Sequence, residues 1–275
     1  MPFVHDPRDL EVDLEAAPPV GSVARRRGRD QRFEVDPDVA ARLYASHPGG
    51  VEAFQAVGDA AQAFLERVVR FLTGDAGLRQ FVVIGASISG RANVHEIAQE
   101  IAPDSRAVYV LFDPVMLVYA HRLQQGTSEG KTAHVEARLR DVDEILRNAA
   151  ATIDLSQPLA LVMQANLSYV RDTSRAAEIV DRFMDPLAAG SYLMVTHHAS
   201  DLLVDEVTPI YRRIAELAAE GRAWDVAPRT QAEVTAFFAR LELVEPGVVP
   251  IEKWRHADRG HKPVKVAIYG AVGHK

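Results

Sequence analysis

Two adjacent histidines, His197 and His198, are the residues of this sequence best suited to moving protons. They follow a short apolar run, Tyr192–Thr196, which is typical of a buried strand. Histidine has the side-chain pKa nearest neutrality, so it can accept and release a proton without a large shift. Adjacent residues of a strand point to opposite faces. If the protein is a catalyst, we expect one of the two to serve as its acid or base and the other to be structural.

Further polar side chains gather after a second apolar run, Leu159–Ala165, and are candidates to contact the same substrate. Tyr169 can donate a proton unaided, and it needs a cation such as Arg138 to act as a base. We expect Arg138 beside this group, where it would favour an anionic substrate. The residues expected to orient the substrate with it are Gln164, Asn166 and Ser168.

Several kinds of chemistry are disfavoured by composition. The chain of 275 residues contains no cysteine, which excludes a thiolate nucleophile, a thiolate metal site and a disulfide scaffold. No histidines and carboxylates stand at metal-ligand spacing, so we expect no metal. A net charge of −7 disfavours a general nucleic-acid partner.

The amino-terminal residues 1–15 are acidic and lack the apolar stretch of a signal peptide. The most apolar stretch, Val108–Ala120, contains Asp113 and is too short to span a bilayer. We therefore expect a cytoplasmic protein that acts on a small molecule, without a membrane partner, and the oligomeric state stays open.

Positioning these side chains requires a sheet, and the apolar pattern predicts one. Short apolar runs alternate with helical stretches, and continuous apolarity suits strands buried on both faces. This alternation predicts a doubly wound α/β fold with helices on both faces. The seven expected strands are Gln80–Ile84, Ala107–Phe112, Thr132–Glu136, Leu159–Ala165, Tyr192–Thr196, Leu241–Val244 and Val264–Tyr269.

The expected helices lie before and between these strands. Val51–Leu72 has apolar residues at three- and four-residue spacing and is followed by glycines, which predicts a long amphipathic helix. Three signals mark helix starts: Asp141 with Glu144, Thr230 with Glu233, and Thr208 with Pro209. The other expected helices are Asn93–Ile101, Val115–Gln125, Asp141–Ala149, Asp172–Leu187, 208–220 and 230–239.

Residues 1–50 are expected to form an irregular amino-terminal arm, because little apolar periodicity precedes Val39. The arm carries a basic run that includes Arg25 and Arg29. Two interpretations stay open for this run, a solvated segment or a flap that closes over an anionic ligand. Residues 51–275 are expected to form one domain with a helical insertion near 201–222.

In a doubly wound sheet the ligand lies beyond the carboxyl ends of the strands, at the point where the strand order reverses. After the first expected strand comes Gly85, which can let backbone approach a ligand, followed by Ala86 and Ser87. After the second comes Asp113, which can hold a ribose hydroxyl or form a turn before Pro114. These positions are the candidate cofactor contacts.

Eight stretches of the chain, in order, resemble a bacterial family of S-adenosylmethionine-dependent methyltransferases. The resemblance implies a seven-stranded class I methyltransferase sheet whose last strand is antiparallel, with S-adenosylmethionine as the cofactor. It covers the chain from about residue 22 to the end, because residues 22–36 weakly match the family's arm. The matching stretches are 77–85, 93–99, 102–110, 113–117, 154–161, 190–197, 241–249 and 268–272.

The chain departs from the family at the positions that orient the cofactor. Where the family has acids after the first three strands, this chain has Val83, Leu111 and Arg138. Ser87 replaces a glycine, and Ser168 stands where the family has a histidine. Each lost charged hydrogen bond is worth roughly 1.5–3 kcal/mol. Two or three losses together predict a fall in cofactor affinity of about 10²–10⁵-fold.

Three functions follow, from different classes. The first is a small-molecule tailoring enzyme on a methyltransferase fold with a remodelled cofactor site, whose chemistry is acid–base or shape-driven, such as cyclisation or rearrangement. The second is a working S-adenosylmethionine-dependent methyltransferase. The third is a non-catalytic protein that binds a ligand or partner. Fold alone does not choose among them.

Overall fold

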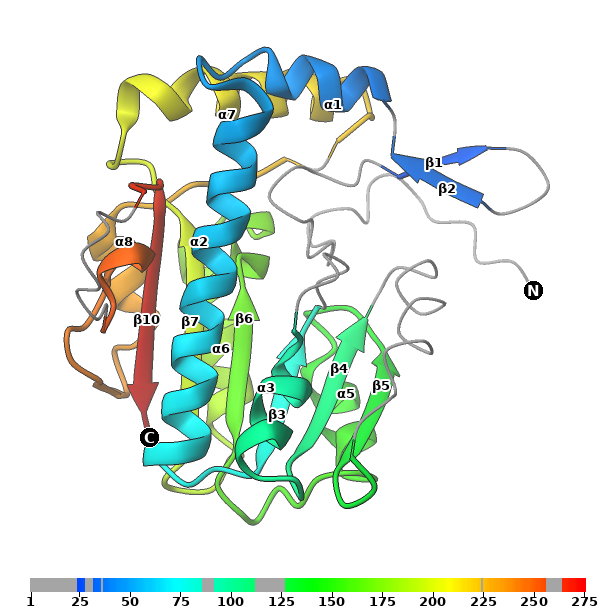
Figure 1. Cartoon of the computed structure of the whole chain (residues 1–275), viewed down its shortest axis with the longest axis vertical. Helices are drawn as coiled ribbons and strands as arrows, with labels where there is room; N and C mark the ends of the chain where they lie inside the picture. Colours follow the sequence, from blue (N-terminus) through cyan, green and yellow to red (C-terminus); the bar gives the residue numbers. More distant parts are fainter. Residues whose placement is uncertain are drawn as a thin grey trace.

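The computed structural model describes residues 24–27, 32–35, 37–85, 92–111, 127–223, 225–255 and 264–275. Its centre is a sheet of strand order β5-β4-β3-β6-β7-β10-β8, with β9 paired to β10 (Figure 1). The strands are β3 (Gln80–Ile84), β4 (Arg106–Leu111), β5 (Lys131–Glu136), β6 (Ala160–Gln164), β7 (Tyr192–His198), β8 (Glu242–Leu243), β9 (Val249–Pro250) and β10 (Ile268–His274).

Strand direction confirms the expected fold class. The strands β3 to β7 pair in parallel, and β10 runs antiparallel to β7. The sheet is therefore doubly wound with an antiparallel last strand. Six of the seven expected strands form within two residues of their expected ends, and the short strand β9 was not expected.

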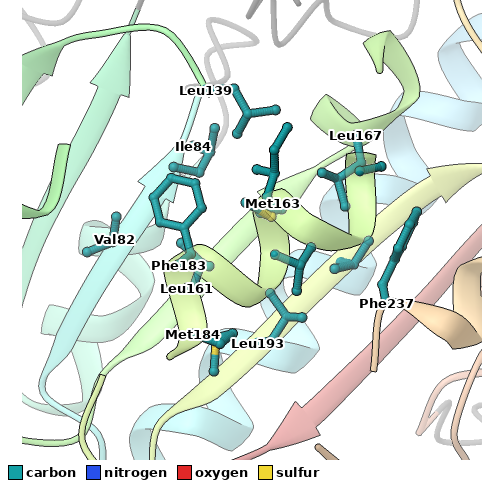
Figure 2. Close-up of a cluster of buried hydrophobic side chains, with 14 of the residues drawn as sticks. Val82, Ile84, Leu139, Leu161, Met163, Leu167, Phe183, Met184, Leu193 and Phe237 are labelled. Carbon is teal, nitrogen blue, oxygen red and sulfur yellow. The ribbon is translucent and has the colours of Figure 1, made fainter. Parts of the chain in front are cut away.

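Helices cover both faces of the sheet (Figure 1). One face, the α2–α3 face, packs Phe81 and Val83 of β3 against α2 and α3. The other, the α5–α6 face, packs Val82 and Ile84 into a cluster that also includes residues of α5, α6 and α8 (Figure 2). This alternation along β3 is the two-residue period of a strand buried on both sides. The helices are α2 (Gly50–Arg70) with the π-helical turn η2 (Phe71–Asp75), α3 (Val94–Ile101), α5 (Val142–Ala149), α6 (Thr173–Met184) and α8 (Gln231–Ala236).

The last strand begins four residues later than the sequence predicts and continues to His274. The expectation of Val264–Tyr269 was wrong at both ends, because the strand starts at Ile268 and continues through Gly270 and Gly273. In the structure both glycines lie inside β10 and admit aromatic rings. A Cβ at Gly270 would come 2.6 Å from Cζ of Phe64 on α2. The glycines are therefore packing positions rather than breaks.

One helix start was predicted wrongly, and one predicted side-chain cap does not form. Helix α7 (Val204–Ala219) begins four residues before Thr208, and Pro209 lies inside it. Helix α7 starts earlier because the Leu203 carbonyl already accepts from the N–H groups three and four residues ahead, those of Glu206 and Val207. Asp141 precedes α5 but makes no side-chain cap, whereas Thr230 and Glu233 form the expected capping box at α8. The expected helix 115–125 lies outside the described residues.

Three described elements of the first 50 residues are regular, contrary to the expected irregular arm. Strands β1 (Ala24–Arg27) and β2 (Arg32–Val35) pair antiparallel, at the end of the molecule toward which the parallel strands point (Figure 1). Helix α1 (Pro37–Tyr44) lies along α7, and Arg42 makes two 2.9 Å hydrogen bonds to Glu220 beyond its end. Arg25 is in β1, and Arg29 lies outside the described residues. Among the described helices, none has the length and apolarity needed to cross a membrane.

Candidate functional site

The carboxyl ends of four parallel strands meet at one edge of the sheet, where the connections change direction. From β3 the chain proceeds to β4 and β5 on one side, whereas β6 and β7 lie on the other side of β3. Such a switch point is where doubly wound sheets bind ligands. We call the ends of β3 and β4 the β3–β4 half of this edge, and the ends of β6 and β7 the β6–β7 half.

The β3–β4 half is apolar where the structure describes it. Val83 and Leu111 are each 1% exposed, and both pack in the cluster under α2 and α3 with Tyr109. Gly85 follows β3 with a φ of 85°, in the region that favours glycine, and donates its N–H to the Val110 carbonyl at 2.9 Å. Outside the described residues lie the other expected cofactor contacts, Ala86, Ser87 and Asp113.

The β6–β7 half begins where Gln164 of β6 pairs in register with Thr196 of β7. Ala165 comes next with a φ of 58°, a left-handed conformation that is uncommon for alanine. Its N–H donates to the Thr196 carbonyl at 3.0 Å and to Oγ1 of Thr196 at 3.1 Å. The chain then turns into the 3₁₀ helix η3 (Asn166–Tyr169). This turn carries three of the residues that the sequence assigned to the site.

His197 is fully buried on the α5–α6 face, with its ring against Phe237. Its Nε2 lies 2.8 Å from Nη1 of Arg229, and a guanidinium can only donate, so Nε2 accepts. The Nδ1 therefore carries the proton and donates to the His198 carbonyl at 2.9 Å. Burial above all, with the charge of Arg229, lowers the pKa of His197 to about 3. With both nitrogens engaged, His197 holds its neighbours in place.

His198 points to the side of β7 opposite His197, as strand geometry predicts. It is partly exposed, and its ring centroid lies 6.2 Å from that of Tyr211 of α7. Burial lowers the pKa of His198 to about 4, so the ring is neutral at pH 7. Its ring makes no hydrogen bond with any other described residue, which leaves both nitrogens available to a ligand.

Arg229 holds the β6–β7 half together, and the sequence analysis missed it. The side chain is 1% exposed. Besides His197, its guanidinium donates to the carbonyls of Leu167 at 2.9 Å and Val170 at 2.5 Å, and to Oγ1 of Thr173 at 3.1 Å. These acceptors belong to η3 and to the chain that leads into α6. Arg229 therefore fixes the turn after β6 to the strand beside it.

The charge of Arg229 is offset at a distance rather than by a contacting carboxylate. Burial lowers the pKa of this guanidinium, while Glu233 and Asp172, near the starts of α8 and α6, raise it. The only signal in the sequence was its place directly before the Thr230 capping box, which is no indication of a buried arginine. Only the fold brings Arg229 to this edge, where its backbone forms a parallel β-bridge with Ala199 just beyond β7.

The remaining predicted residues are placed as follows. Ser168 is buried with its Oγ 3.4 Å from Nε2 of His197, and its carbonyl accepts from the Ala227 N–H. Asn166 is 0% exposed, and Tyr169 is partly exposed at the end of η3. Arg138 follows β5, which β4 and β3 separate from β6. The edge therefore gathers Gln164, Asn166, Ser168, Tyr169 and the two histidines, and leaves Arg138 at its far side.

No metal site stands at this edge as far as the structure describes it: no three histidine or carboxylate side chains there, or elsewhere among the described residues, could share an ion. The chemistry available at the β6–β7 half is hydrogen bonding by amides and hydroxyls, together with two neutral imidazoles.

The sheet order, the antiparallel last strand and the ligand edge at β3 and β6 define a class I methyltransferase fold. Residues 27–275 match the sequence profile of a family described as S-adenosyl methyltransferase, and this chain belongs to that family.

Two solved structures are similar over nearly the whole chain. A DUF574 family protein from Streptomyces avermitilis MA-4680 is 34% identical, with a TM-score of 0.79 over 97% of this chain and 99% of that one. A protein from Thermobifida fusca YX, described as a candidate methyltransferase, is 28% identical, with a TM-score of 0.76 over 97% and 96%. No curated protein matches the chain.

Proposed function

We propose that this protein acts on a small molecule at the β6–β7 half of the edge, and that its S-adenosylmethionine site is remodelled so that methyl transfer is not its main task. The observation that carries the proposal is the burial of Val83 and Leu111, each 1% exposed, at the positions where the resemblance places cofactor-binding acids. An aliphatic side chain accepts no hydrogen bond from a ribose hydroxyl. Val83 and Leu111 therefore do not fit the cofactor, although Gly85 keeps a backbone conformation that suits a close ligand.

The chemistry we propose is acid–base or shape-driven, such as a cyclisation or rearrangement in which the substrate supplies all the atoms of the product. His198 is the proposed base, because its ring is neutral at pH 7 and has no other described hydrogen-bond partner. Tyr169 is the proposed acid, and Gln164 the substrate-orienting neighbour. His197 and Ser168 act through the turn that they hold. The substrate is a small molecule, with neither a nucleic acid nor a membrane as partner.

The proposal is tested by restoring an acid at a position that tolerates one. Arg138 is partly exposed after β5, so Arg138→Asp is expected to fold, and Arg140→Asp, two residues along and equally exposed, is the matched charge control. Thermal unfolding with and without S-adenosylhomocysteine measures binding, because a ligand of the folded state raises the Tm.

We expect no rise in Tm for the natural protein or for Arg140→Asp, and at most a small rise for Arg138→Asp. A rise of several degrees for the natural protein at low micromolar ligand would contradict the proposal.

A working methyltransferase is the second candidate, and two observations favour it. The family profile spans residues 27–275. In addition, Glu136 of β5 is exposed and pairs in register with Leu111, so a carboxylate lies one strand from the vacated position. If Glu136 holds the cofactor, Glu136→Gln abolishes a Tm rise that the natural protein shows with S-adenosylhomocysteine.

A further inference from the structure

Asn166 is the first residue of η3, directly beyond the end of β6. It is 0% exposed, and neither its Oδ1 nor its Nδ2 has a hydrogen-bond partner in the described part of the chain. Buried amides in folded proteins nearly always pair both atoms, and each atom left unpaired costs free energy. A wholly unpaired amide at a ligand-binding edge therefore calls for a partner from outside the chain.

The turn that carries Asn166 is tied to neighbouring elements on both sides. Before it, Ala165 is fixed in the left-handed region by its two hydrogen bonds to Thr196. After it, the carbonyls of Leu167 and Val170 accept from Arg229. The unpaired state is thus built into the fold, in the manner of a preorganised binding group.

We propose that Asn166 binds the substrate through an amide-type edge, a neutral group with a hydrogen-bond donor and an acceptor side by side, as in a lactam, an imide or a primary amide. A carboxamide presents Oδ1 and Nδ2 side by side, so it pairs with such an edge through two hydrogen bonds. The inference rests on the proposed function, because it names the substrate class of the same site.

The charges around Asn166 favour this neutral class over an anion. A carboxylate only accepts hydrogen bonds, so it would leave Oδ1 of Asn166 unpaired. The guanidinium of Arg229 already donates to backbone carbonyls, to Thr173 and to His197, so these donors are not available to an anion. Gln164, two residues earlier, is a second carboxamide with no hydrogen bond to another described residue. Arg138, the cation expected to attract an anion here, lies beyond β5.

The test follows the side-chain NH₂ signal of Asn166 in the ¹⁵N-labelled full chain, assigned by its loss in Asn166→Leu. The probe is 2-pyrrolidinone, and N-methyl-2-pyrrolidinone is its match without the N–H donor. We expect 2-pyrrolidinone to shift the Asn166 signal saturably. The N-methyl compound and acetate should bind at least about 5-fold more weakly, because the loss of one hydrogen bond lowers affinity by about this factor.

Asn166→Leu removes both hydrogen bonds with little change in size, so it should weaken binding of 2-pyrrolidinone by about 10- to 30-fold. Asn148→Leu, on the exposed side of α5, is the matched control and should leave binding unchanged. Because Asn166→Leu also removes two unpaired buried atoms, it should unfold at the same or a higher urea concentration. Asn166→Ala, which removes both amide atoms and introduces no charge, is the second variant if the leucine variant does not fold.

The inference is overturned if the Asn166 signal does not shift saturably, if the N-methyl probe binds equally well, or if the variants bind as the natural protein does. A water bonded to both amide atoms in crystals grown with the probe would overturn it as well. A parallel titration with S-adenosylhomocysteine separates the two claims. If only the amide probe fails to bind, the inference about Asn166 is wrong and the proposed function is not contradicted. Tight binding of S-adenosylhomocysteine would contradict the proposed function.

Discussion

Where the structure describes them, the two halves of the carboxyl edge differ in their side chains, which are apolar in the β3–β4 half and largely polar in the β6–β7 half. In the β3–β4 half, Val83 and Leu111 continue the apolar core up to the ends of their strands. In the β6–β7 half, Arg229 ties the turn after β6 to β7 by donating to five acceptors, on Leu167, Val170, Arg171, Thr173 and His197. The difference shows that, among the described residues, the same sheet supports apolar packing at one half of its ligand edge and a hydrogen-bonded turn at the other.

The largest effect is expected at Arg229, on which the organisation of the β6–β7 half depends. Arg229→Met keeps much of the packing but leaves the carbonyls of Leu167 and Val170 without their side-chain donor, and leaves Nε2 of His197 with only the 3.4 Å contact to the Ser168 hydroxyl. Buried unpaired groups of this kind cost about 1–3 kcal/mol each, so we expect a loss of about 3–5 kcal/mol in the free energy of unfolding. Urea unfolding, with the slope compared between proteins, measures it.

Arg147→Met on the exposed side of α5 is the control for Arg229 and should change stability by less than about 0.5 kcal/mol. If Arg229→Met costs no more than this control, the network does not hold the turn, and the contrast between the halves disappears.

A smaller loss in the free energy of unfolding is expected when the pH is lowered, through the two histidines of the β6–β7 half. The folded-state pKa of His197 is lowered to about 3 from an unfolded value near 6.5. Below pH 6.5 the unfolded state therefore binds a proton that the folded state refuses, so stability falls as the pH falls. The slope approaches about 1.4 kcal/mol per pH unit for each such group, or about 2 kcal/mol between pH 6.5 and 5.

His197→Phe isolates the contribution of this ring, because it removes the titrating group and keeps an aromatic side chain against Phe237. The variant is expected to be less stable at pH 7, because Arg229 loses an acceptor, and to show a flatter decline on acidification. His198 adds to the decline through its own lowered pKa and remains in this variant. Parallel profiles for the natural protein and His197→Phe between pH 7 and 5 would contradict the assignment of a neutral, buried His197.

Most of the scaffold could be predicted from the sequence because it rests on local patterns. Continuous apolar runs identify strands such as Gln80–Ile84, and the Thr230 capping box is a short-range signal. The errors came where tertiary packing overrides the pattern. The last strand continues past Tyr269, where Gly270 and Gly273 make room for the rings of Phe64 and Phe238.

The candidate site could be predicted only in part. Its polar residues after β6 follow from the rule that ligands bind beyond strand ends, and the opposite directions of His197 and His198 follow from strand alternation. The partners of those residues could not be foreseen. Arg229 is 32 residues from His197 along the chain, so no local spacing pointed to their contact. The unpaired amide of Asn166 likewise depends on burial, which no short motif records.

The central claim is that the β3–β4 half no longer holds the cofactor of its family. Isothermal titration of the natural protein with S-adenosylmethionine and with S-adenosylhomocysteine tests it most directly. The loss of acids at positions 83, 111 and 138 predicts affinity weaker by about 10²–10⁵-fold than that of a site that keeps them, and no cofactor retained through purification. A low-micromolar Kd for either compound, or protein that carries the cofactor as isolated, would contradict the account.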